Sequence, residues 1–162
     1  MSAPTKCSVP MAEPLRRTLA DLLGRPVELK ASPGAMKTIT KGVIAEYARA
    51  DGTAVGLYVV DLPFAAYAGA ALSMVPVGVA SESIRAGKLE PNLMENAREV
   101  FNILGSQLNA PGFPHCSLKT VHAIPGPLPP TVTAIVAKPL ARLELAVTIG
   151  GYGAGVFATL VG

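Results

Sequence analysis

The most informative stretch of the chain is residues 91–109, PNLMENAREVFNILGSQLN. At about 100° per residue, its apolar side chains fall within one arc of roughly 120°, and its carboxylates and carboxamides fall on the opposite side. The apolar set comprises Leu93, Ala97, Val100, Phe101, Leu104 and Leu108. The pattern predicts a helix with one buried stripe. It also predicts a polar row at i, i+4, i+7 and i+11, formed by Glu95, Glu99, Asn102 and Ser106.

The polar row differs from an ordinary solvated helix face. Asparagine is a mediocre helix former, yet the segment contains four asparagines, and lysine is absent from the row. Glu95 and Glu99 stand at i and i+4, where like charges repel each other mildly. Ile103 stands among the polar residues, as an exposed contact for a partner protein does. A solvated face with local hydrogen bonds remains the alternative, because Glu-x-x-Asn is a weak pattern on its own.

The chain before this segment predicts helices and a strand hairpin. A first helix is expected over residues 14–23, because proline is favoured at the first helical position. Residues 27–31 have the composition of a short strand, and two longer runs, 38–48 and 53–60, flank an Asp-Gly pair that is a strong hairpin signal.

A second group of helices is expected between the hairpin and the polar row. Asp61 can cap a helix that has Pro63 in its first turn. The following residues, 64–75, are rich in alanine and glycine, so another helix or sheet can approach them closely. We interpret this surface as internal packing, with a dimer contact as the less favoured use. A short helix over residues 79–86 is expected to end at Gly87.

The chain after the polar row predicts a strand meander. Strands are expected at 116–124, 131–137, 142–149 and 156–161. The glycine-rich residues 150–155 predict a hairpin turn and not a phosphate-binding loop, because neither GK[ST] nor a helical pattern follows them. The order of elements predicts an α+β domain over residues 13–162, with long helices packed on a mostly antiparallel sheet. Residues 1–12 are expected to be a flexible N-terminus.

Composition excludes several classes of function. The 162 residues suit one domain, and 15% charged residues against a usual ~25% favour an oligomer or partner interface. The net charge of +3 comes without a basic run, so we expect no nucleic-acid partner. Two uncharged runs, 62–81 and 145–162, are broken by prolines or glycines, and no signal-peptide pattern is present. We expect a cytoplasmic protein without membrane insertion.

The cysteines and histidines do not predict a metal site. Cys7 and Cys116 lie far apart and belong to no Cys-x-x-Cys motif. Together with His115 and His122 they do not make up a zinc ligand set at the usual spacing. We expect two reduced thiols and no bound metal.

The polar row resembles the sequence signature of a known protein family. Glu95-xxx-Glu99-xx-Asn102, followed after twenty-two residues by Pro125, resembles the signature of the CheC/CheX/FliY chemotaxis phosphatases. That signature is Asp or Ser, three residues, Glu, two residues, Asn, twenty-two residues and Pro. Gly105 resembles the small residue that often follows the family's Asn.

At most one such site is present. Members with two sites have a second Glu-x-x-Asn on the first helix, where this chain has Glu13-Pro14-Leu15-Arg16, with arginine in place of asparagine. The chain is therefore similar to CheX, which implies a homodimer.

The resemblance implies a function in two-component signalling. The substrate is then a response-regulator receiver domain phosphorylated on an aspartate. Asn102 would orient the hydrolytic water, and Glu99 would pair with a lysine of the receiver. The receiver would supply Mg²⁺, so no cofactor of the chain's own is expected. Partner contacts are expected at Glu95, Ile103 and Ser106.

Two other functions remain open. The chain could be a catalytically silent domain of the same fold that binds a receiver or serves as a flagellar-switch-type scaffold. It could also be an unrelated enzyme that uses Glu95 and Glu99 as an acid/base pair. The last is the least favoured, because two carboxylates on one helix face do not face each other across a substrate.

Overall fold

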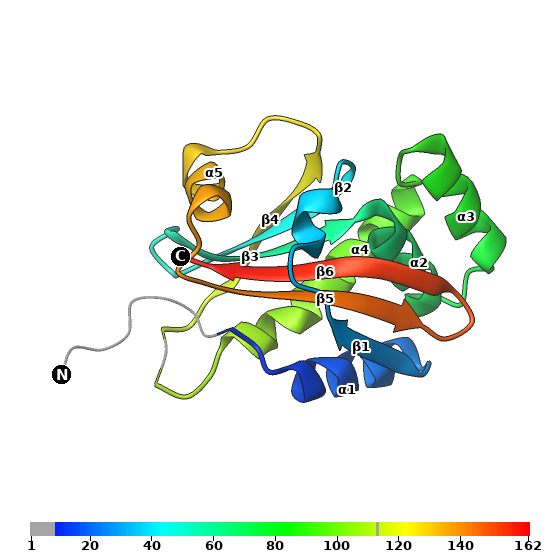
Figure 1. Cartoon of the computed structure of the whole chain (residues 1–162), viewed down its shortest axis with the longest axis horizontal. Coiled ribbons are helices and arrows are strands. Elements are labelled where there is room, and N and C mark those ends of the chain that lie inside the picture. Colours follow the sequence, from blue (N-terminus) through cyan, green and yellow to red (C-terminus); the bar gives the residue numbers. More distant parts are fainter. Residues whose placement is uncertain (1–8, 113) are drawn as a thin grey trace.

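Six strands form the sheet on which the helices pack (Figure 1). The computed structural model describes residues 9–112 and 114–162, so most of the segment predicted to be flexible lies outside the described ranges. The strands are β1 (Val27–Ala31), β2 (Gly42–Ala48), β3 (Ala54–Asp61), β4 (Ser117–Ile124), β5 (Ala141–Ile149) and β6 (Gly153–Val161). Their order in the sheet is β1-β5-β6-β3-β2-β4, and all neighbours are antiparallel. The predicted α+β class is confirmed.

Helices cover both faces of this sheet. They are α1 (Ala12–Leu23), α2 (Leu62–Leu72), α3 (Val77–Ala86), α4 (Pro91–Leu104) and α5 (Pro130–Ala137), with 3₁₀ turns η1 (Ala35–Thr38) and η2 (Gly105–Leu108). Successive strand residues point to opposite faces. On β2, Val43 packs in the cluster of α1, α2 and α4, and Ile44 packs in the cluster of α5. Strands β2 and β3 are therefore buried on both faces and carry long apolar runs.

The small residues of α2 serve internal packing, as predicted. A Cβ on Gly69 would lie 2.5 Å from the carbonyl oxygen of Leu93 in α4. A Cβ on Gly155 of β6 would lie 2.5 Å from the backbone nitrogen of Phe64. The carboxylate of Asp61 caps α2 by accepting a 2.9 Å hydrogen bond from the Phe64 amide. Helix α2 is thus held tightly between α4 and the sheet, which fixes where α4 lies.

Residues 131–137, predicted as a strand, form helix α5. The prediction was wrong because it rested on a run of β-branched residues, whose strand preference is easily overridden by packing. Pro130 occupies the first turn of the helix. Val132 and Ile135, three residues apart, are both buried against the second face of the sheet. The spacing of Val132 and Ile135 fits a helix with one buried face, which the strand prediction did not consider.

The predicted hairpin over the glycine-rich residues 150–155 is confirmed. Strands β5 and β6 pair from Ile149 opposite Gly153, and Gly151 has a φ of 80°, which favours glycine. Across residues 9–112 and 114–162, no helix is both long and apolar enough to cross a membrane.

Candidate functional site

Helix α4 has the two faces that the sequence predicts. Pro91 begins the helix, and Leu93, Ala97, Val100, Phe101 and Leu104 are buried. The helix packs against α2 and α1 and beside β4 (Figure 1). The opposite face is directed to solvent, and Glu95, Glu99, Asn102 and Ser106 are all exposed on it.

The side chains of this row are open to a partner. Among the described residues, Glu95, Glu99 and Asn102 form no side-chain hydrogen bond and no ion pair. The Ser106 hydroxyl donates locally to the carbonyl of Ile103 at 3.1 Å. The Ile103 side chain is 37% exposed, which confirms the predicted apolar residue beside the row. A carboxylate, a carboxamide and an apolar side chain are therefore presented together.

Two buried tyrosines anchor the backbone beneath Asn102. The Tyr58 hydroxyl on β3 donates to the carbonyl of Leu104 at 2.8 Å, and the Tyr47 hydroxyl on β2 donates to that of Phe101. Burial raises the pKa of the Tyr47 hydroxyl far above its usual value, so the hydroxyl remains a donor at any physiological pH. The two carbonyls bracket Asn102 in the sequence, so the sheet fixes the turn of helix that carries it.

Gly105 belongs to the same anchor. A Cβ at this position would lie 3.0 Å from Cε1 of Tyr47. The tyrosine ring therefore packs directly under the end of α4, where a larger residue would push it away. Sequence reasoning noted the glycine but missed both tyrosines. Their only signal was an aromatic residue in each of two paired apolar strands.

Carboxamides beside the row have structural roles. Asn96 donates from Nδ2 to the carbonyl of Gly69 at 2.9 Å, and Gln107 donates from Nε2 to Oγ1 of Thr18 on α1 at 3.0 Å. Asn109 exchanges two hydrogen bonds with the backbone of Cys116, at 2.8 and 2.9 Å. Two of the four asparagines of the segment are thus explained by packing. The functional interpretation therefore depends on Asn102.

Solved structures of FliY and of the FliM middle domain share this architecture. Thermotoga maritima FliY gives a TM-score of 0.55 at 15% identity, covering 91% of this chain and 82% of its own. The FliM middle domain from H. pylori gives 0.58 at 10% identity, covering 93% and 84%. A chain of the FliM–SpeE complex from H. pylori gives 0.59 at 11% identity, covering 93% and 81%. The chain has the CheC/CheX/FliY fold. No protein-family model and no curated protein matches the sequence.

Pro125, the proline of the family signature, does not lie next to the polar row of α4. Pro125 lies beside Pro91 and Met94, where it lines a pocket at the N-terminal end of α4. Met94 and Asn102 are eight residues apart, which corresponds to about 12 Å along a helix. Pro125 therefore does not contribute to a site around Asn102.

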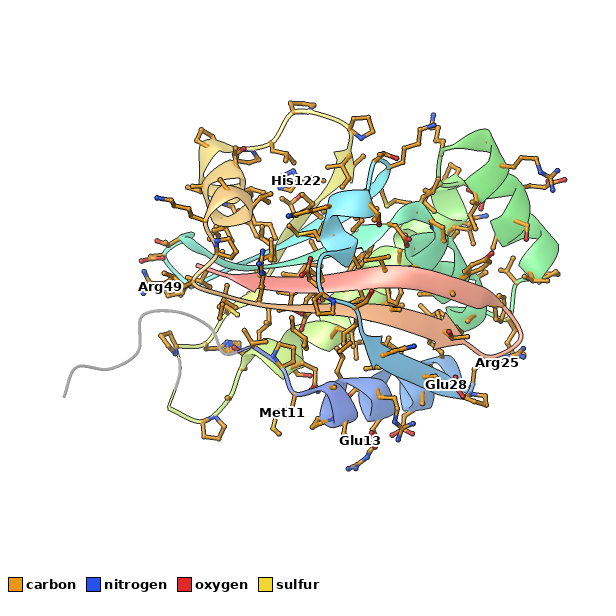
Figure 2. The ribbon with its side chains drawn as sticks, viewed as in Figure 1. Met11, Glu13, Arg25, Glu28, Arg49 and His122 are labelled. Carbon is orange, nitrogen blue, oxygen red and sulfur yellow. The ribbon has the colours of Figure 1, made fainter. Side chains whose placement is uncertain are left out.

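Helix α1 carries Glu13 and Arg16, at the stretch that the sequence analysis compared with a second Glu-x-x-Asn site. Arg16 donates from Nε to Oε2 of Glu13 at 2.8 Å and from Nη2 to Oε1 at 2.6 Å. These hydrogen bonds from Arg16 hold the pKa of the Glu13 carboxyl below its usual value. Figure 2 shows Glu13 on the side of α1 that faces away from the sheet. The Glu13 carboxylate is therefore already paired with Arg16, a contact that the sequence analysis did not predict.

Among the residues that the structure describes, cysteine and histidine provide no competing site. Cys116 is buried, and Cys7 lies outside the described residues. His122, labelled in Figure 2, contacts Oε1 of the buried Glu46 through Nε2 at 2.8 Å. Nζ of Lys119 lies 3.7 Å from Oε2 of Glu46. Within the described part of the chain, no group of three or more His, Cys, Asp or Glu residues is placed to hold a metal ion.

Proposed function

We propose that this protein removes phosphate from the phosphorylated aspartate of a response-regulator receiver domain. The observation that supports the proposal is the pair Glu99 and Asn102. The two side chains are exposed one turn apart on α4, and neither forms a hydrogen bond or an ion pair with a described residue. The turn that carries them is anchored to the sheet by hydrogen bonds from Tyr47 and Tyr58.

The chemistry required is modest. An aspartyl phosphate is already activated, so its hydrolysis needs chiefly a water molecule placed in line with the leaving oxygen. A carboxamide can both donate and accept hydrogen bonds, and it brings no negative charge to the phosphoryl group. Asn102 orients that water. The receiver supplies the Mg²⁺ that neutralises the phosphate, so this chain binds no metal of its own.

Glu99 positions the receiver. An unpaired, exposed carboxylate attracts a lysine of the partner and sets the register in which α4 docks. Glu95 and Ser106 extend the same face, and Ile103 adds an apolar contact beside it. We place this activity in cytoplasmic two-component or chemotaxis signalling, with the protein acting as a homodimer.

A catalytically silent binding domain is the second candidate. The Arg16–Glu13 ion pair supports it, because α1 has an arginine where a second site would have a carboxamide, and its glutamate is already paired. Such a protein would recognise a receiver or a flagellar-switch component through α4 without hydrolysing anything. The acid/base interpretation of Glu95 and Glu99 has no such support, since both carboxylates point to solvent from one helix face.

The decisive experiment follows the loss of phosphate from receivers of the same organism after phosphorylation with acetyl phosphate. Wild type should accelerate the loss, and Asn102→Ala should reduce the acceleration by at least about tenfold, because the group that orients the water is gone. Asn92→Ala is the matched control, since Asn92 is also exposed on α4 but lies outside the row. Equal rates with wild type and Asn102→Ala would refute catalysis. Receiver binding without turnover by wild type would support the silent domain.

A further inference from the structure

A pocket of about 450 Å³ opens at the N-terminal end of α4, away from Asn102. It lies where the starts of β2 and α2 meet the α3–α4 connection and the end of β4. Its apolar lining includes Val43, Leu62, Leu89, Met94, Ile124 and Pro125. Pockets of this size and character bind small organic molecules in many proteins.

The charged groups of the pocket are of one sign. Lys41 and Lys88 line it, and no acidic residue does so within the described part of the chain. Neither ammonium group forms an ion pair with a described residue. The pocket therefore combines an apolar interior with charged lining residues that are all positive.

Lys41 is the stronger of the two anion-binding candidates. A Cβ on Gly87 would lie 2.5 Å from Nζ of Lys41, so the glycine leaves the space in which the ammonium group rests. Lys88 also lines a neighbouring hollow that contains Glu82 and Glu90, and these carboxylates offset part of its charge. An anion in the pocket is therefore expected to approach Lys41.

We propose that this pocket binds a small organic acid, with its apolar body against Met94 and Pro125 and its carboxylate at Lys41. Burial of the apolar body supplies most of the affinity, and the ammonium group selects the sign of the charge. The inference is independent of receiver dephosphorylation, because it uses no residue of the polar row. It also gives Pro125 a place in a binding site, although not in the site that the sequence suggested.

Titration of the ¹⁵N-labelled protein with octanoate and with octylamine tests this proposal. Octanoate should shift backbone amide resonances around the pocket, including those of Gly42, Gly87 and Met94. Octylamine has the same apolar body and the opposite charge, so it should not. Equal binding of both compounds, or octanoate shifts spread over the whole surface, would overturn the proposal.

Two variants test where the carboxylate and the apolar body of octanoate bind. Lys41→Met should weaken octanoate binding by about tenfold, because a charge-assisted hydrogen bond is lost. Lys30→Met is the control, since Lys30 is exposed on β1 and lies outside the pocket. Ala123→Phe places a ring in the pocket from an exposed position and should abolish binding. If Lys41→Met and Lys30→Met bind octanoate equally, or if Ala123→Phe still binds it, the proposed site is wrong.

Discussion

Helices α1 and α4 present the same spacing to solvent, a glutamate followed three residues later by a nitrogen-bearing side chain. On α1, Arg16 closes on Glu13 through two hydrogen bonds. On α4, the side chains of Glu99 and Asn102 stay apart and engage no other described residue. The guanidinium of Arg16 neutralises the charge of the Glu13 carboxylate, whereas the uncharged carboxamide of Asn102 leaves the charge of Glu99 in place. One residue therefore decides whether the helix face is satisfied internally or left open to a partner.

The largest effect is expected when α4 receives the glutamate–arginine pair that is found on α1. In Asn102→Arg, the guanidinium should reach Glu99 as Arg16 reaches Glu13. The carboxamide proposed to orient the water and the carboxylate proposed to dock the receiver are then both lost. Under the proposed function, the rate of receiver dephosphorylation should fall by about 100-fold or more. The free energy of unfolding, measured by denaturant titration, should change by less than about 0.5 kcal/mol because the site is exposed. A variant that keeps the wild-type rate would contradict the assigned roles.

A smaller effect is expected from the anchor under α4. Tyr58→Phe removes the donor to the buried carbonyl of Leu104. The free energy of unfolding should fall by about 1–2 kcal/mol, and the melting temperature should fall by about 2–8 °C. Calorimetry of this variant can be compared with Tyr152→Phe, which removes a similar 2.8 Å bond to Val75 in a partly exposed place. Equal melting temperatures for the two variants would show that the anchor is not special.

The smallest effect is expected on α1. Arg16→Asn removes the guanidinium that lowers the pKa of the Glu13 carboxyl, so this pKa should rise toward its usual value. A lowered folded-state pKa stabilises the fold above the unfolded pKa, and the contribution is lost as the pH falls through the folded value. The stability difference between wild type and Arg16→Asn should therefore disappear in acid. NMR titration of the Glu13 carboxyl measures the shift directly, and an unchanged pKa would show that the pair is a weak one.

The sequence was sufficient for elements whose burial follows a clear period. The stripe from Leu93 to Leu104 and the exposure of Glu99 and Asn102 follow from the 3.6-residue repeat alone. The cap at Asp61 also follows from local chemistry. Such features depend on residues close together in the chain, so tertiary structure does not alter them.

Features that depend on distant residues were missed or misplaced. Helix α5 was predicted as a strand because its β-branched residues suit both structures and only contact with the sheet selects the helix. The bond from Tyr47 to Phe101 joins residues fifty-four positions apart. Pro125 matches the family spacing, yet the path of β4 carries it to the opposite end of α4. No local pattern reports where a strand ends relative to a helix.

The tyrosine anchor has an evolutionary consequence. It acts on the backbone of α4, whereas the side chains of Glu99 and Asn102, the proposed functional pair, form no hydrogen bond or ion pair with a described residue. Exchanges at these two positions leave the architecture intact, so selection can remove or restore an activity without first repairing the scaffold. Under the proposed function, very few mutations therefore separate a protein that hydrolyses its partner's aspartyl phosphate from one that only binds the partner.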